Sequence, residues 1–160
     1  MAVKKWEDLE KDCLWARSHY YMTFLVCKSW YRASLDPSCW KIINFQEFVR
    51  QLPLVDEYLK SIINRSQGNA TTVMLPTTCS DEVLRYLADE CPALKALYLP
   101  SIDVGADIGR EAASAIVTFL PNIKYLHIRN GRIDRKNLEI IMQGCKELVH
   151  LDVRGSLIFM

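Results

Sequence analysis

His127 and Asp152 are the two side chains of the 160-residue sequence that best fit an acid–base pair, because they stand at matching positions of consecutive repeats. An imidazole beside a carboxylate can move protons, but an active site also needs a nucleophile or a metal ion. The facing repeat positions supply neither, and a further histidine, His19, lies in a different segment. We therefore predict that the chain is not an enzyme.

Six cysteines are spread over the chain, and no two have the C-x-x-C spacing of redox or metal sites. In a reducing compartment such residues are free thiols, mostly buried as small apolar side chains. Cys91 and Cys145 each lie three residues before the first apolar residue of a repeat, where another repeat has Leu120. That equivalence indicates packing, so we predict no metal and no cofactor.

Composition and charge argue against several other functions. The net charge is +1 and basic residues are scattered, so no global field attracts nucleic acid or an anionic membrane. The patterns G-x-x-x-x-G-K, G-x-G-x-x-G and H-E-x-x-H are absent. No apolar run approaches the roughly 18 residues of a membrane span, and residues 1–8 lack the apolar core of a signal peptide. We expect a cytoplasmic or nuclear protein.

A six-residue pattern, apolar-x-x-apolar-x-apolar, recurs between residues 70 and 153, with a weaker first copy, and positions His127, His150 and Asp152. Its central apolar residues follow one another at steps of 24, 29 and 25 residues. They are Val73, Leu97, Leu126 and Leu151. The period and the pattern are those of leucine-rich repeats, which stack into solenoids.

Helices are predicted between the repeated segments, because apolar residues there follow helical spacing. They span residues 80–90, 110–120 and 134–143. Ser80 and Asp134 are suited to cap two of them at the N-terminus. A strand followed by a helix, repeated, pairs neighbouring strands in parallel. The sequence therefore predicts an α/β fold over residues 69–160, a short solenoid of about three to four repeats with parallel strands and convex helices.

In each predicted strand, the residues between the apolar positions point to the opposite, concave face. Aligned across the repeats, they form rows of aromatic, histidine and arginine side chains. Tyrosine and arginine are favoured anchors of protein interfaces, so we predict that a protein target binds here. The predicted target-contact residues are Tyr98, Tyr125, His127, Arg129, His150 and Arg154. The alternative is that these side chains are simply solvated on an open sheet.

The first 43 residues differ from the rest, since all four tryptophans lie within the first 40. Apolar residues at helical spacing predict helices here, and Asp36-Pro37 is expected to end the last of them. So short a segment cannot bury a core alone and must pack on the rest of the chain or on a partner. Residues 44–68 are predicted as a connecting or capping helix, with Gly68 near its end.

Three stretches of the N-terminal segment, residues 6–14, 26–31 and 36–40, carry a family resemblance. They resemble an F-box, and are most similar to those of plant F-box/leucine-rich-repeat proteins. The resemblance implies that residues 1–43 bind a Skp-type adaptor, and through it a cullin, while the repeats hold a target for ubiquitination. The implied adaptor-contact residues are Leu9, Leu14, Val26, Cys27, Trp30 and Trp40.

The sequence departs from the F-box pattern in two places. Only eleven residues separate Leu14 from Val26, about two helical turns fewer than an ordinary F-box has. Glu10 follows Leu9, where a proline is usual. The alternative to a ligase adaptor is therefore a repeat scaffold without coupling to the ligase.

The last residues, 156–160, follow the final repeated segment without a polar capping helix. An uncovered strand edge beside an apolar tail favours aggregation. We expect the chain to be a shortened product of a longer repeat protein, with an incomplete binding surface.

Overall fold

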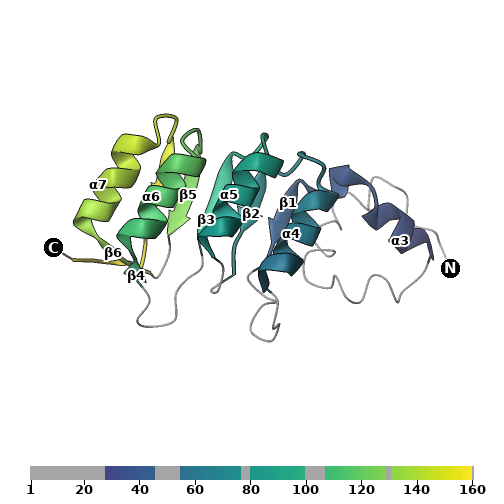
Figure 1. Cartoon of the computed structure of the whole chain (residues 1–160), viewed down its shortest axis with the longest axis horizontal. Helices are drawn as coiled ribbons and strands as arrows, with labels where there is room; N and C mark the ends of the chain where they lie inside the picture. Colours follow the sequence, from purple (N-terminus) through teal and green to yellow (C-terminus); the bar gives the residue numbers. More distant parts are fainter. Residues whose placement is uncertain (1–27, 46–54, 77–79, 100–106, 129–130, 160) are drawn as a thin grey trace.

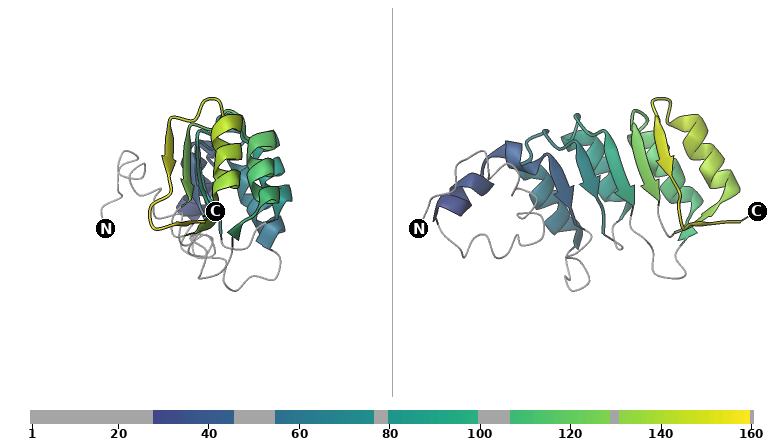
Figure 2. Two further views of the ribbon diagram at one scale, coloured as in Figure 1. Left: turned by 90° about the vertical axis from the view of Figure 1, so that its left-hand side faces the viewer. Right: turned by 180° about the vertical axis from the view of Figure 1, so that it is seen from behind.

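The computed structural model describes residues 28–45, 55–76, 80–99, 107–128 and 131–159, and these ranges form an elongated row of strand–helix units (Figure 1). Helices line one side of the row and strands line the other, as the view from behind shows (Figure 2). Among the described helices, none is long and apolar enough to cross a membrane.

Five strands of the described ranges form the main sheet, and all neighbours pair in parallel. In order across the sheet they are β1 (Ile42–Asn44), β2 (Thr72–Met74), β3 (Ala96–Leu99), β5 (Tyr125–Ile128) and β7 (His150–Asp152). The central apolar residues of the repeats are in register, since Leu97 pairs with Val73 and with Leu126. Leu126 in turn pairs with Leu151. The predicted equivalence of these four segments is therefore confirmed.

Strand β1 extends the sheet beyond the predicted repeats. It was not predicted from the sequence, yet Ile43 pairs in register with Val73, so one more strand precedes β2 in the sheet. The repeat pattern is present here too, because Trp40, Ile43 and Phe45 follow the apolar-x-x-apolar-x-apolar spacing. All three side chains are buried. The N-terminal segment therefore joins the repeat sheet directly.

Four helices of the described ranges pack in sequence along one side of the main sheet (Figure 1). They are α4 (Val55–Arg65), α5 (Asp81–Glu90), α6 (Arg110–Phe119) and α7 (Arg135–Gly144). The predicted helices agree with the last three to within a residue at each end. Each helix turns apolar residues toward the sheet, and Leu59, Leu87 and Ile116 are fully buried there. The core thus lies between one layer of helices and one of strands.

The predicted caps differ in their chemistry. At the start of α7, the Asp134 carboxylate accepts a hydrogen bond of 2.9 Å from the Lys136 N–H, as an N-cap residue should. Ser80 stands at the N-cap of α5, but its hydroxyl makes no capping bond and donates to the carboxylate of Asp56 instead. Ser80 therefore ties α5 to the neighbouring helix α4.

A second, smaller parallel sheet was not predicted. Within the described ranges it contains β4 (Asp107–Ile108), β6 (Arg132–Asp134) and β8 (Leu157–Phe159), with β6 in the middle. Strands β4 and β6 lie just before α6 and α7. Ile108 and Ile133 pair with each other and are buried. The short strands therefore align the entries of successive helices.

The described N-terminal elements are helix α3 (Lys28–Ser34) and the 3-10 turn η1 (Pro37–Trp40). Asp36 separates them, as predicted, and its carboxylate accepts a 2.9 Å hydrogen bond from the Ser38 N–H. That bond lowers the pKa of the Asp36 carboxyl below its ordinary value. The charged aspartate thereby fixes the turn that leads into β1.

Candidate functional site

Side chains on the helix-free face of the main sheet form the candidate site, and they come from β3, β5 and β7. The register places Tyr98 beside His127, and His127 beside Asp152. Two residues earlier along the same strands, Tyr125 pairs with His150. We call these five residues the strip. The alignment of these positions predicted from the repeats is confirmed.

The imidazole of His127 is held between two other rings. The ring of Tyr98 stacks on it, with centroids 3.9 Å apart and planes 1° from parallel. The ring of His150 lies on a tilt of 48°, with its centroid 5.5 Å away. Aromatic stacking is worth about 0.5–1.5 kcal/mol beyond burial. His127 is consequently only 9% exposed, although it points to the face without helices.

Asp152 is 3% exposed, and the charge of its carboxylate is paired with that of Arg154. The side chain of Arg154 donates hydrogen bonds of 2.9 Å and 2.8 Å to its two oxygens. The backbone N–H of Arg154 adds a third, of 3.1 Å. The side-chain hydrogen bonds with Asp152 raise the pKa of the Arg154 guanidinium above its ordinary value. A buried carboxylate requires such pairing to remain charged.

His127 and Asp152 lie side by side, since Nδ1 of the histidine is 3.4 Å from Oδ2 of the aspartate. The paired positions on β2, β3, β5 and β7 contain one side-chain hydroxyl of the serine or threonine type, that of Thr72. Thr72 is on β2, two strands away from His127. The register partners of His127 are therefore Tyr98 and Asp152, and neither is a serine or threonine.

The predicted target-contact residues divide by exposure. Tyr125 is 42% exposed, and His150 and Arg154 are exposed as well. Tyr98 is half-buried because it covers His127. Arg129 lies outside the described residues. Asp152 was not among the predicted contacts, although its place in the repeat pattern marked it as a member of the same row.

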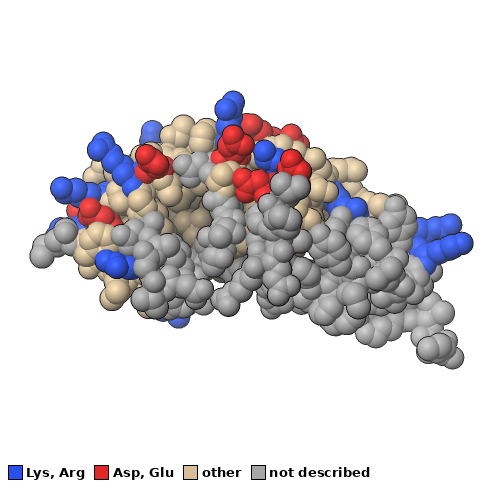
Figure 3. Space-filling model, turned by 60° about the horizontal axis from the view of Figure 1, so that its bottom comes forward, with Lys and Arg blue, Asp and Glu red and all other residues tan. Residues whose placement is uncertain are grey.

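Charged side chains of both signs lie on the described surface that Figure 3 shows. This matches the net charge of +1. A partner of the strip would therefore be chosen by local contacts more than by long-range attraction.

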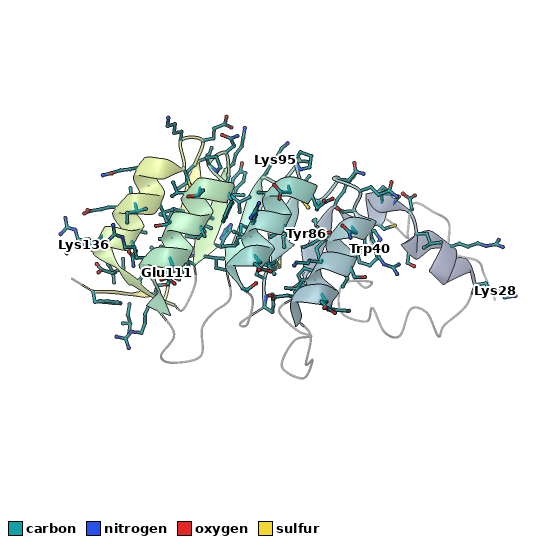
Figure 4. All side chains as sticks on the ribbon, viewed as in Figure 1. Lys28, Trp40, Tyr86, Lys95, Glu111 and Lys136 are labelled. Carbon is teal, nitrogen blue, oxygen red and sulfur yellow. The ribbon has the colours of Figure 1, made fainter. Side chains whose placement is uncertain are left out.

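The predicted adaptor-contact residues are only partly described. Leu9, Leu14, Val26 and Cys27 lie outside the described residues, and so does the side chain of Trp30. Trp40 is 6% exposed and lies beside α4 (Figure 4). Its indole N–H donates a 2.8 Å hydrogen bond to the Ser34 carbonyl, and the Arg65 guanidinium lies 5.8 Å from its ring. Trp40 thus packs the N-terminal segment on the repeats, and its role toward an adaptor stays a prediction.

Two of the described cysteines are buried where the repeat pattern placed them. Cys91 and Cys145 follow α5 and α7 directly and are almost inaccessible. Burial raises the pKa of both thiols above the ordinary value. Neutral, enclosed thiols are unreactive. These two cysteines therefore serve packing, as the sequence predicted.

Comparison with known proteins gives relatives of one kind, although no protein-family model matches the chain. An F-box/LRR-repeat protein of Arabidopsis thaliana is 24% identical over 225 aligned positions, which cover 96% of this chain and 73% of the relative. Putative F-box/LRR-repeat protein 19 of the same plant is 24% identical and covers 95% of this chain and 79% of its own length. F-box protein SKIP1 is 32% identical over 48% of this chain and 29% of its own length.

The first of these alignments is longer than the chain itself, which has 160 residues. The relative therefore has positions without a counterpart here. The similarity nevertheless extends over almost the whole sequence and includes both the N-terminal segment and the repeats. The resemblance predicted from the sequence is confirmed: the chain is a relative of the plant F-box/leucine-rich-repeat proteins.

Proposed function

We propose that this protein is a substrate-recognition adaptor of a Skp–cullin–F-box ubiquitin ligase. The N-terminal segment binds the Skp-type adaptor, and the strip binds a protein marked for degradation. The observation that carries the proposal is the similarity to F-box/LRR-repeat proteins over 96% of the chain. Catalysis belongs to other subunits, and the complex works in the cytoplasm or the nucleus.

The repeats serve this function as a leucine-rich-repeat solenoid, which is part of the same proposal. Five registered parallel strands within the described ranges, each except the edge strand β7 followed by a helix on the same side, support it. Each unit buries its apolar face against its neighbours, as in repeat proteins. The side of the sheet without helices is then left for a partner.

The strip has the chemistry of a protein-binding surface. Tyr125 and His150 pair across β5 and β7 and are both exposed. Tyr98 and His127 form a rigid stacked base beside them. Rigid aromatic side chains give contact area at a low cost in conformational entropy. We therefore place the centre of target binding at Tyr125 and His150, with Arg154 at its border.

The second candidate is a repeat scaffold that does not couple to the ligase. The short spacing of eleven residues between Leu14 and Val26 favours it. The residues missing there normally contribute to the surface that an adaptor contacts. The two candidates differ in one property, which is the binding of a Skp-type adaptor.

Co-expression of the full chain with a plant Skp-type adaptor tests the proposal. We expect a complex that remains intact through size-exclusion chromatography and is lost on Trp30→Ala. Tyr125→Ala is the matched control, because it removes an exposed aromatic ring of the strip and should leave this complex unchanged. A native chain that elutes without the adaptor would refute the ligase role and leave the scaffold.

Target binding is tested separately by affinity purification from plant extract. Proteins captured by the native chain should be lost with the double variant Tyr125→Ala and His150→Ala. They should persist with Lys136→Ala, which removes an exposed side chain from α7 on the opposite side of the sheet. Equal capture by all three chains would show that the strip does not bind the target.

A further inference from the structure

Three side chains of the strip bring metal-ligating atoms together. One donor atom each of His127, His150 and Asp152 lies within 4.8 Å of the other two. His150 and Asp152 are two residues apart on β7 and so share a face of the sheet. His127 is the partner of Asp152 in register on β5. All three therefore project from paired strands, which hold them more firmly than loops would.

The separation between His127 and Asp152 matches a tetrahedral ion. Ligands at about 2.0–2.1 Å from zinc are roughly 3.3 Å apart along an edge of a tetrahedron. Nδ1 of His127 and Oδ2 of Asp152 are 3.4 Å apart, which is a separation that two ligands of one tetrahedral ion have. His150 is exposed, and rotation of its side chain can bring the third donor closer.

The donor set also selects the kind of metal. Two imidazoles and one carboxylate suit Zn²⁺, whereas Mg²⁺ and Ca²⁺ take oxygen ligands almost exclusively. The stacked ring of Tyr98 fixes the plane of His127, which limits the reorganisation that binding requires. Cys91 and Cys145 are not ligands of this site, because they are buried in the core at the ends of α5 and α7.

We propose that His127, His150 and Asp152 bind one Zn²⁺ on the helix-free face of the sheet. Three protein ligands leave a fourth position for water or for a side chain of a partner. This site does not depend on adaptor binding, since all three ligands belong to the repeats.

Arg154 competes with the ion in this site. Its Nη2 donates to Oδ2 of Asp152, the same oxygen that faces His127. The Arg154 side chain is 75% exposed, so it can turn into solvent when zinc arrives. Zinc thus replaces the guanidinium as the counter-charge of the buried carboxylate. Removing Arg154 should consequently strengthen zinc binding.

Titration of the purified full chain with Zn²⁺ alone, in competition with a chromogenic chelator, tests the site. We expect one ion per chain. The affinity for zinc should fall by at least about 10-fold in His150→Ala. Loss of a residue that only hydrogen-bonds to a metal ligand already weakens metal binding by about that factor. His150 is exposed, so its loss should leave the fold intact, as circular dichroism would verify. Arg154→Ala should bind zinc more tightly than the native chain.

His19→Ala is the matched control, since it removes the one histidine of the sequence that is not among the three proposed ligands. It should bind zinc as the native chain does. Cobalt(II) gives a second readout, because a tetrahedral site absorbs visible light strongly and His150→Ala should lose that absorption. Equal zinc affinity of His150→Ala and the native chain would overturn the proposal, since other residues would then hold the ion. So would the absence of binding in the native chain.

Discussion

Gly144, the last residue of α7, packs against α6 so closely that it has no room for a larger side chain. A methyl group added there would lie 2.6 Å from Cγ2 and 2.9 Å from Cβ of Val117, and closer still to Cγ1. Carbon atoms do not approach within 3.0 Å without displacement of one of them. Gly144→Ala must therefore push α7 away from α6 or force Val117 out of its conformation.

The expected cost follows from two opposing terms. Forcing an extra methyl group into a packed contact costs about 1–3 kcal/mol. Alanine in place of glycine stabilises a helix interior by up to about 1 kcal/mol, and by less at a helix end. The net change is a loss of about 1–2 kcal/mol. For a chain of 160 residues, this lowers the melting temperature by roughly 2–8 °C.

Urea unfolding followed by circular dichroism measures this loss directly. Gly131→Ala is the control, because its added methyl group would meet Ile128 and Ser156 at ordinary distances of 3.6 Å and 4.0 Å. Val117→Ala in the Gly144→Ala background should recover part of the stability, since it removes the two closest atoms. If Gly144→Ala proved as stable as the native chain, α6 and α7 would not pack as described.

Three further changes test other contacts by urea unfolding. Trp40→Phe should lower the free energy of unfolding by about 1 kcal/mol, since it removes the hydrogen bond to Ser34. An unchanged free energy of unfolding would contradict that bond. Asp134→Ala should also cost about 1 kcal/mol through the lost cap on α7, and Asp134→Ser should restore most of it. Burial raises the pKa of the Cys91 thiol above 9.0, so stability should hold below pH 9 and fall as the pH rises through the raised pKa. Cys91→Ala should decline less steeply, and an equal decline would contradict the burial effect.

The sequence predicted most of the main sheet because every repeat has the same spacing of apolar residues. Leu97 and Leu126 come into register since their neighbours bury the same faces. Strand β1 escaped prediction because Trp40 was assigned to the F-box resemblance, although it also opens a copy of the repeat pattern. The small second sheet escaped because its strands lie outside the repeated six-residue segments.

The composition of the strip was predictable, but its packing was not. The repeat pattern aligned His127 with Asp152, yet it could not show that Tyr98 would cover the histidine. It also could not show that Arg154 would neutralise the carboxylate, because that contact depends on side-chain rotamers. As a result, His127 and Asp152 are buried on the helix-free face of the main sheet, where the sequence pattern predicted solvent-facing side chains.

Adaptor binding is the property on which the proposed function depends most. Calorimetric titration of the full chain with a purified plant Skp-type adaptor measures it without a cell extract. We expect saturable 1:1 binding with a dissociation constant in the micromolar range or below, abolished by Trp30→Ala and unchanged by Tyr125→Ala. The absence of heat and of complex at adaptor concentrations well above micromolar would contradict the ligase role.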